Sequence, residues 1–387
     1  MVKCRICSGA KTRLMYDFGL IPKSGFFLKN VDDSYPQETL RFHYCLDCAG
    51  VFRENSDSRT PDYSHVDRST TRQIPDYLDQ ILFDLGLKDD EFIIEVGSND
   101  GYLLEQLKSK GAKKILGIEP SYNLSQRCKN NGFKVECTHL DWDNAEKLIE
   151  SYGYADIVMC RHTLEHVPHP RDFLRAIYLL LKESGRVFIE VPSLMPIIDQ
   201  RLHGYEFWDE HLSYFSEETL QNLLIEAGFE ISGIESREHC GSENILCWAR
   251  KAPQCQNIEG NRPICKILEL SETFAFRWDE FKEALSCYIR DLPRPIAALG
   301  ASHPQINFLH FTGISLYIDQ LIDDDLHKRG QFVPSFCHPV ITTEESISLA
   351  MPTILDTAFG YPRWIESLKN KNKRKPQAVI DPLKLIK

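Results

Sequence analysis

The sequence predicts an α/β protein in three parts: a metal-binding module at the amino terminus, a doubly wound central domain and a smaller α/β domain. Three observations lead to this prediction. Two C-x-x-C pairs lie near the start, apolar strands alternate with amphipathic helices from about residue 72, and a strand, glycine turn and helix recur after a polar linker. We expect the parts to span residues 1–60, 61–252 and 253–387, since 387 residues suggest two or three domains.

Composition and charge point to a small-molecule ligand. The chain has 45 basic and 56 acidic residues, a formal net charge of −11, which argues against nucleic acid or an anionic membrane as the main partner. No apolar run approaches the roughly 18 residues of a membrane-spanning helix, and the start, MVKCRICSGAK, lacks the apolar core of a signal peptide. We therefore expect a cytoplasmic protein.

The first part contains two candidate metal knuckles, Cys4 with Cys7 and Cys45 with Cys48. Each pair offers two thiolates, and four thiolates make the closed tetrahedral shell of structural Zn²⁺. FGLIPKSGFF and ETLRFHYC predict a strand, a turn and a returning strand that bring the second knuckle to the first. Chance pairing among 13 cysteines is the alternative. A closed shell leaves no position for substrate, so the predicted zinc is structural and holds a module too small to bury its own core.

The central part predicts a largely parallel sheet with helices on both faces. Its strand-like segments are EFIIEV, KKILGIEP, ADIVMCRH and RVFIEVPS, and its helix-like segments are IPDYLDQILFDLGL, DGYLLEQLKSKG, LSQRCKNNGF and RDFLRAIYLLLKESG. Continuous apolar strands separated by amphipathic helices are typical of a sheet buried on both sides. Ligands of such sheets bind at the carboxyl ends of the strands.

The first of these strands runs into a glycine loop, EVGSNDG. Gly97 and Gly101 permit a tight turn and close approach of a ligand to the backbone. Asn99 stands where a dinucleotide fingerprint has its middle glycine, so NAD is disfavoured and an adenosine-type ligand without a diphosphate fits better. Glu119 ends the next strand, about 20 residues on, where an acidic side chain accepts hydrogen bonds from ribose. An ordinary turn and a solvated glutamate remain the alternative.

These motifs carry a family resemblance. IIEVGSNDGYLL, GIEPS, CRHTLEHVPHPRDFL and GRVFIEVPSL resemble the motifs of class I S-adenosylmethionine-dependent methyltransferases, which have a Rossmann-like fold. The order of a Cys4 module, this domain, an EHLSYF segment and a second glycine-turn domain resembles the nucleotide-sugar C-methyltransferases over nearly the whole chain, less so at 250–290. The resemblance implies that S-adenosylmethionine is bound by Glu95, Gly97, Ser98, Asn99, Asp100, Gly101, Glu119, Pro120 and Arg161.

Methyl transfer to carbon requires a base, because carbon becomes a nucleophile only when a proton beside a carbonyl is removed. A keto sugar supplies that carbonyl. His211 is the candidate base: it follows the strand RVFIEVP by a loop, a neutral imidazole can take the proton, and the proposed base of the family's E-H-x-S-Y-F motif falls on it. Glu210 is the candidate for orienting His211, although a neighbouring carboxylate can equally point away. A structural role is the alternative for a lone loop histidine.

Three further histidines, His162, His166 and His169, follow the fourth strand. A metal site made of these three is disfavoured, because Pro168 and Pro170 break the helix that would hold them on one face. The resemblance implies that His162 and His166 contact the sugar and its carbonyl. We therefore expect His166 in the active site and His169 on the surface.

Trp208 and Tyr63 are two further residues of the predicted active site. The family usually has Tyr-x-Glu-His where this chain has Trp208, Asp209, Glu210 and His211. Indole can stack on a sugar and donate one hydrogen bond, but it cannot exchange a proton as phenol can, so the substrate or the holding of its oxyanion is expected to differ. Tyr63 falls near a tyrosine that the family places at its active-site lid, and a packed linker tyrosine fits it equally well.

The carboxyl-terminal third predicts a second α/β half. Residues 253–265 form a polar linker, LELSETFAFRWDEFKEAL a helix, and RPIAALGASHPQINFLHFTGI a strand, turn and helix. The resemblance implies that this half holds the nucleotide-sugar, through Gly300, Ala301, Ser302, Asp323 and Lys328. The family's lysine and glycine after G-A-S are replaced here by His303, Pro304 and Gln305, which leaves diphosphate recognition open.

The sequence thus predicts an enzyme that transfers a methyl group from S-adenosylmethionine to carbon of a nucleotide-linked keto-deoxysugar. Two other functions stay open. One is methyl transfer to oxygen or nitrogen of a sugar, which needs no adjacent ketone. The other is a zinc-containing binding protein that keeps the donor fold without turnover, for which Trp208 and His303 are the best support.

Overall fold

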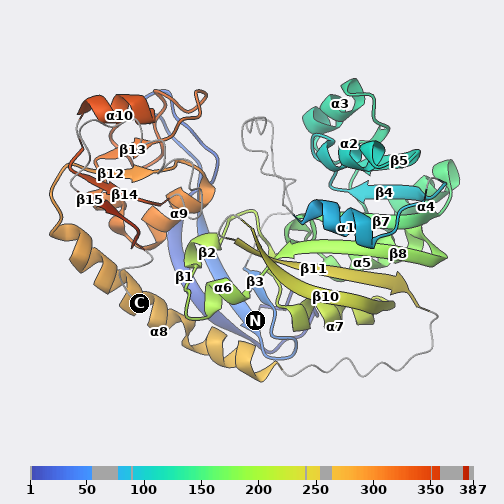
Figure 1. The fold of residues 1–387 in the computed structure, drawn as a ribbon. Helices are drawn as coiled ribbons and strands as arrows, with labels where there is room; N and C mark the ends of the chain where they lie inside the picture. The colour runs from blue at the N-terminus through green and yellow to red at the C-terminus, as the bar shows by residue number, and fades with distance from the viewer. Residues whose placement is uncertain are drawn as a thin grey trace. The chain divides into compact units, whose positions relative to one another are not determined.

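The computed structural model describes residues 2–54, 77–88, 90–239, 242–252, 264–349, 351–357 and 378–382 (Figure 1). The chain divides into two compact units. Unit 1 contains residues 1–14, 42–195 and 210–268, and unit 2 contains residues 15–41, 196–209 and 269–387. Segments 15–41 and 196–209 group with the carboxyl-terminal residues in unit 2. The division into three parts at residues 60 and 252 stays a prediction.

Unit 1 is built on a seven-stranded sheet in the order β10-β11-β8-β7-β4-β5-β6. The strands are β4 (Phe92–Val96), β5 (Lys114–Ile118), β6 (Val135–Glu136), β7 (Ala155–Arg161), β8 (Leu181–Pro192), β10 (Phe229–His239) and β11 (Ser242–Lys251). Neighbouring strands from β6 to β8 are parallel, and β11 pairs antiparallel with both β8 and β10. The predicted parallel sheet is confirmed, and its strand order reverses between β4 and β7, where such sheets bind ligands.

Helices cover both faces of this sheet (Figure 1). They are α1 (Leu78–Asp84), α2 (Tyr102–Ser109), α3 (Tyr122–Asn130), α4 (Trp142–Tyr152), α5 (Pro170–Leu180) and α7 (Glu217–Glu226), with a 3₁₀ turn, η3, at Leu164–His166. The short helix α6 (Met195–Ile198) belongs to unit 2 except for its first residue. Alternate strand residues face opposite layers: Ile93 packs with α1 and α2, whereas Ile94 packs with α4, α5 and α7. Pro170 opens α5 with a fixed φ, and Ser216 caps α7 by accepting a hydrogen bond from Thr219 N at 3.1 Å.

A second sheet has the order β1-β2-β3-β9, with β1 (Thr12–Pro22), β2 (Gln37–Cys45), β3 (Val51–Arg53) and β9 (Ser213–Tyr214). The predicted strand, turn and returning strand of the first part are β1 and β2. β1 and β2 contribute residues to both units. In unit 1, β3 pairs antiparallel with β9 through Val51 with Tyr214 and Phe52 with Ser213.

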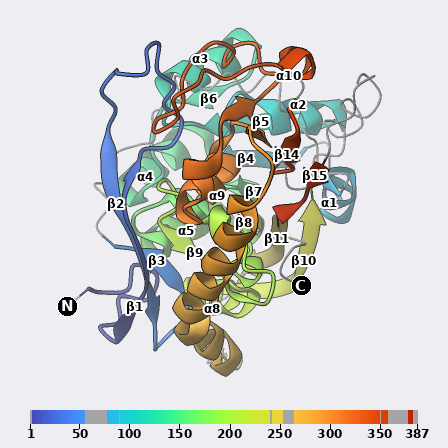
Figure 2. The ribbon, with the colours of Figure 1, turned by 90° about the vertical axis from the view of Figure 1, so that its left-hand side faces the viewer.

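Unit 2 contains a parallel sheet in the order β13-β12-β14-β15. Its elements are η4 (Gly204–Glu206), α8 (Cys265–Arg290), β12 (Ile296–Leu299), α9 (His303–Phe311), η5 (Ile314–Tyr317), β13 (Gln320–Ile322), α10 (Thr343–Leu349), β14 (Thr353–Leu355) and β15 (Ala378–Ile380). Helix α8 runs beside α9 (Figures 1 and 2), where the rings of Phe281 and Phe308 are 6.4 Å apart. This is the smaller α/β half that the sequence predicts.

Aromatic side chains from three segments form part of the core of unit 2. Phe18 of β1 lies 4.2 Å from Phe311 of α9 and 5.6 Å from Phe207, measured between ring centroids. Asn307 Nδ2 donates to the carbonyl of Phe207 at 3.0 Å. Gly204 is required in this segment, since a Cβ there would lie 2.8 Å from the ring of Trp278. In the described part of the chain, no helix combines the length and apolarity needed to cross a bilayer.

Candidate active site

The glycine loop after β4 turns through three residues in left-handed conformation, Gly97, Asn99 and Gly101, with φ of 79°, 51° and 88°. A Cβ on Gly97 would lie 2.1 Å from Thr163 Oγ1, and one on Gly101 would lie 3.0 Å from Cys128 Sγ. Asparagine is one of the few residues other than glycine that tolerates this region. The loop therefore comes close to its neighbours only because it lacks side chains at these two glycines.

Glu119 joins the glycine loop to the end of β5. Its Oε2 accepts a hydrogen bond from Asn99 N and its Oε1 one from Ser121 N, both at 2.8 Å. Because a carboxylate has about four acceptor positions, these two bonds leave capacity for ribose hydroxyls. The other predicted donor-site residues lie at the carboxyl ends of β4, β5 and β7, and they are Glu95, Ser98, Asp100, Pro120 and Arg161.

Glu95 is a buried carboxylate at this strand end. Its side-chain Oε2 has no hydrogen-bond partner, and burial raises the pKa of the carboxyl well above its ordinary value. Arg161 ends β7 and pairs through Nε with Glu190, which also accepts from Tyr77 OH at 2.6 Å. Burial therefore favours the neutral acid in the ligand-free protein, and a cationic group of a bound ligand would favour the ionised form.

His211 and His166, the two histidines expected in the active site, lie together in unit 1. Their ring centroids are 4.8 Å apart and their planes cross at 75°. His211 is 9% exposed. The backbone next to it is held by two hydrogen bonds: Leu212 N donates to Glu165 O at 2.7 Å, and Leu212 O accepts from Arg53 N at 3.0 Å. His166 Nδ1 lies 2.9 Å from the carbonyl of Glu210. A carbonyl only accepts, so Nδ1 carries the proton and Nε2 keeps its lone pair.

Glu165 is the residue at this site that sequence reasoning missed. It is 1% exposed, and neither carboxylate oxygen has a hydrogen-bond partner. Its Oε1 lies 3.9 Å from His166 Nε2 and 3.6 Å from His162 Nδ1. The available signal was an acidic residue between two histidines, His162 and His166, directly after the apolar Leu164.

His162 stands between two carboxylates with φ of 46°. Its Nε2 lies 3.3 Å from Glu190 Oε1, on the opposite side from Glu165. Partial burial opposes a charge on the ring, but the two carboxylates outweigh it and raise the pKa of His162 to about 9. His169 caps α5 and is exposed, as the sequence predicts. Tyr63 lies outside the described residues.

Unit 2 repeats the loop arrangement of unit 1. Gly300 has φ of 95°, and the next amide, Ala301 N, donates to Asp323 Oδ2 at 2.9 Å. Lys328 Nζ lies 2.8 Å from the same oxygen. Ser302 precedes α9 and contacts Gln305 through its hydroxyl. The predicted nucleotide-site residues are therefore brought together at the carboxyl ends of β12 and β13.

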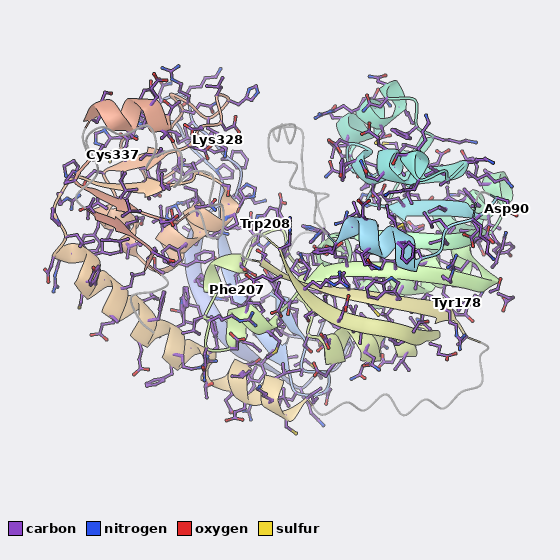
Figure 3. All side chains as sticks on the ribbon, in the orientation of Figure 1. Asp90, Tyr178, Phe207, Trp208, Lys328 and Cys337 are labelled. Atoms are coloured by element: carbon purple, nitrogen blue, oxygen red, sulfur yellow. The ribbon has the colours of Figure 1, made fainter. Side chains whose placement is uncertain are left out.

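Trp208 and His303, the two main departures from the family pattern, contact each other within unit 2. Their ring centroids are 4.9 Å apart. Trp208 is labelled in Figure 3, as is Lys328 of the same unit. Asp209, next in sequence, accepts from Ser24 N at 3.2 Å. A substitution at either residue is therefore expected to alter the packing of the other.

The four predicted metal cysteines form one cluster with two matching knuckles. The Sγ atoms of Cys4 and Cys48 are 3.7 Å apart, and those of Cys7 and Cys45 are 3.5 Å apart. A tetrahedral Zn²⁺ with Zn–S bonds of about 2.3 Å requires about 3.8 Å between sulfurs. In each knuckle a left-handed residue, Ser8 or Ala49, follows the second cysteine and donates its amide to the carbonyl of the first at 2.9 Å. The residues therefore fit zinc.

Comparison with known proteins agrees with this geometry. The family described as "Methyltransferase domain" matches residues 66–232. The chain is 24% identical to C-methyltransferase NovU of Streptomyces niveus, over 95% of this chain and 92% of that protein. The protein is an S-adenosylmethionine-dependent methyltransferase. The resemblance noted from the motifs, the class I Rossmann-like fold and the enzyme prediction are thereby confirmed.

Other relatives match this methyltransferase over a part of its chain. The ubiquinone biosynthesis O-methyltransferase of Yersinia enterocolitica is 33% identical over 29% of this chain, which spans about half (46%) of that enzyme. Among solved structures, an S-adenosylmethionine-dependent methyltransferase from Clostridium acetobutylicum aligns with 48% of this chain and 96% of its own, with 12% identity and a TM-score of 0.38. The individual site residues remain predictions.

Proposed function

We propose that this methyltransferase acts on carbon of a nucleotide-linked keto-deoxysugar, with His211 as the base that forms the enolate. The main support is the pairing of His211 with His166 beside the carboxyl ends of the parallel strands. The similarity to a C-methyltransferase over almost the full length of both chains adds to it.

The donor site would be formed by the loop from Gly97 to Gly101 together with Glu119 and Glu95. Bound S-adenosylmethionine supplies an electrophilic methyl group. The glycine backbone leaves room for close approach of the ligand, Glu119 has acceptor capacity for ribose hydroxyls, and the buried Glu95 carboxylate suits a positively charged group. These residues bind and orient the donor, and positioning accounts for much of the rate of such a reaction.

His211 would take the proton from the carbon beside the ketone. Both the N–H and the carbonyl of the next residue, Leu212, are hydrogen-bonded. The imidazole of His211 is therefore positioned before substrate arrives. His166, with its proton on Nδ1, presents Nε2 as an acceptor for a sugar hydroxyl. His162 would also contact the sugar. The backbone carbonyl of Glu210 accepts a hydrogen bond from His166 Nδ1. A role for the Glu210 carboxylate in orienting His211 stays a prediction.

Unit 2 would hold the nucleotide part of the substrate. Its loop from Gly300 to Ser302, with Asp323 and Lys328, has the arrangement that binds a nucleoside in unit 1. His303 stands where the family has a lysine, and Trp208 offers a ring face for stacking on the sugar. We also propose that Cys4, Cys7, Cys45 and Cys48 hold a structural Zn²⁺, which takes no part in methyl transfer.

Solvent exchange tests the base directly. A candidate 4-keto sugar nucleotide is incubated with enzyme in D₂O without methyl donor, and loss of the proton beside the ketone is followed by NMR. We expect exchange with the wild type and with His169→Asn, and loss of exchange with His211→Gln. Exchange that persists in His211→Gln would refute the base assignment.

Methyl transfer to oxygen is the second candidate, favoured by Trp208 in place of the family's tyrosine and by the similarity of 29% of the chain to an O-methyltransferase. It predicts methyl transfer to sugars without a ketone and no exchange beside the ketone. Mass spectrometry of products from matched keto and hydroxy sugars separates the two functions.

A further inference from the structure

A second cluster of metal-ligand side chains lies apart from the four cysteines. Glu165, His166 and His211 each offer one ligand atom, and these atoms all lie within 4.8 Å of one another. Two imidazoles and one carboxylate are a frequent three-residue donor set for divalent transition metals, which leaves a further position open. The proposed base accounts for His211 alone and leaves Glu165 without a role.

Glu165 supplies an independent reason to expect a cation here. Its carboxylate is buried and has no hydrogen-bond partner on either oxygen, although His162 and His166 lie within 4 Å. A buried ionised group is stable only when it is paired, hydrogen-bonded or bound to a metal. Its Oε1 faces the Nε2 side of His166, so the charge is directed into the cluster rather than to solvent.

The tautomer of His166 is that of a metal ligand. Its Nδ1 donates to the backbone carbonyl of Glu210, so its Nε2 carries the lone pair with which an imidazole can coordinate a metal. Metal-bound histidines usually donate their second nitrogen in this way to a carbonyl or carboxylate. The ring of His211 crosses that of His166 at 75°, so lone pairs of both rings can converge on one point.

We propose that Glu165, His166 and His211 bind a divalent transition-metal ion, Zn²⁺ in the first instance. Tetrahedral Zn²⁺ with bonds of about 2.0 Å needs about 3.3 Å between ligand atoms, so modest side-chain rotation closes the present spacing. Imidazole ligands disfavour Mg²⁺ and Ca²⁺, which prefer oxygen. A metal on His211 occupies the lone pair that takes the proton, so the metal-loaded form has lost the proposed base.

Cobalt spectroscopy tests the site without any need for methyl transfer. Metal-free full-length protein is titrated with Co²⁺. Binding to four thiolates gives intense sulfur-to-cobalt charge-transfer absorption, whereas binding to two nitrogens and one oxygen gives only weak visible bands. We expect two equivalents to bind, one of each kind. Glu165→Gln and His166→Asn should weaken the second by about tenfold or more and keep the first. His169→Asn, a nearby exposed histidine, should keep both.

Two results would overturn the proposal: a wild type that binds a single equivalent through thiolates, or variants that bind the second equivalent as the wild type does. The thiolate band and calorimetry with S-adenosylmethionine report whether each variant is folded. Added Zn²⁺ should also abolish solvent exchange beside the ketone, and full exchange in metal-saturated enzyme would refute the loss of the base. If cobalt binds as expected but enzyme that carries metal only at the four cysteines shows no exchange, the base assignment fails while the metal site stands.

Discussion

Glu119 and Asp323 make the same contact in separate α/β units, each accepting a hydrogen bond from the backbone amide of a glycine loop. Glu119 binds Asn99 N at 2.8 Å, and Asp323 binds Ala301 N at 2.9 Å. Each acid directly follows the second strand, in chain order, of its parallel sheet, β5 or β13. The acid therefore shapes the loop as well as offering an acceptor to a ligand.

Replacing Glu119 should weaken donor binding. Glu119→Gln removes the charge that accepts both amides, and hydrogen bonds to charged groups contribute about 1.5–3 kcal/mol each, so we expect a dissociation constant for S-adenosylmethionine at least about tenfold higher. Calorimetry of the full chain measures it. Asp323→Asn is the matched control and should leave donor affinity unchanged. Equal affinity in Glu119→Gln and the wild type would show that Glu119 does not bind the donor.

Gly97 should tolerate no side chain. Gly97→Ala places a Cβ 2.1 Å from Thr163 Oγ1 at a left-handed φ, so it should lower the free energy of unfolding by about 3 kcal/mol or more and abolish donor binding. Gly132→Ala has a similar φ of 82° but no atom within 4 Å of its Cβ, and it should cost only about 1 kcal/mol. Urea unfolding measures the free energy of unfolding of both variants. Similar losses of stability in the two would contradict the role of the contact with Thr163.

Removing one thiolate should empty the cysteine cluster. Cys45→Ser leaves three thiolates and should reduce the zinc bound by this site from one per chain to near zero, with a lower thermal midpoint. Metal analysis and a melting curve measure both effects. Cys137→Ser, at an exposed cysteine outside the cluster, should change neither. Unchanged zinc in Cys45→Ser would exclude the four-cysteine site.

His310 should make unit 2 sensitive to acid. Burial lowers the pKa of His310 from 6.5 to about 4, although a hydrogen bond that the ring donates to the backbone carbonyl of Pro334 acts in the opposite direction. Between these values the unfolded chain binds a proton that the folded chain does not. Stability is therefore full above pH 6.5, falls by about 3 kcal/mol as pH drops to 4, and changes no further from this group.

Comparison of urea unfolding at pH 7 and pH 4.5 tests this prediction. His310→Leu should lose this part of the pH dependence, whereas His327→Asn, at an exposed histidine of the same unit, should retain it. A wild type and a His310→Leu variant with the same pH dependence would show that His310 does not titrate as stated.

The parts predicted well from sequence are those whose signals are local. Strands such as FIIEV are apolar except at Glu95 because both faces are buried, and the glycines of the β4 loop mark φ values that other residues rarely adopt. The two cysteine knuckles are equally local, because each is closed by hydrogen bonds within six residues.

What sequence reasoning missed depends on packing between distant segments. Glu165 meets His211 only because η3 and the chain before β9 lie together, and sequence reasoning considered metal ligands only among His162, His166 and His169, which are close in the chain. Phe18 and Phe207 place their segments in unit 2 through aromatic contacts with Phe311 and Phe274. The strand pair β10 and β11 was also not predicted, although it completes the sheet beside β8.

The pairing of β3 with β9 has a consequence for control of the enzyme. β3 follows the second cysteine knuckle, and its Arg53 amide holds the residue after His211. If the four cysteines hold zinc and His211 is the base, as proposed, loss of the metal or oxidation of the thiols is expected to loosen that strand and displace the imidazole. An oxidising environment would then stop methyl transfer while affinity for the methyl donor persists.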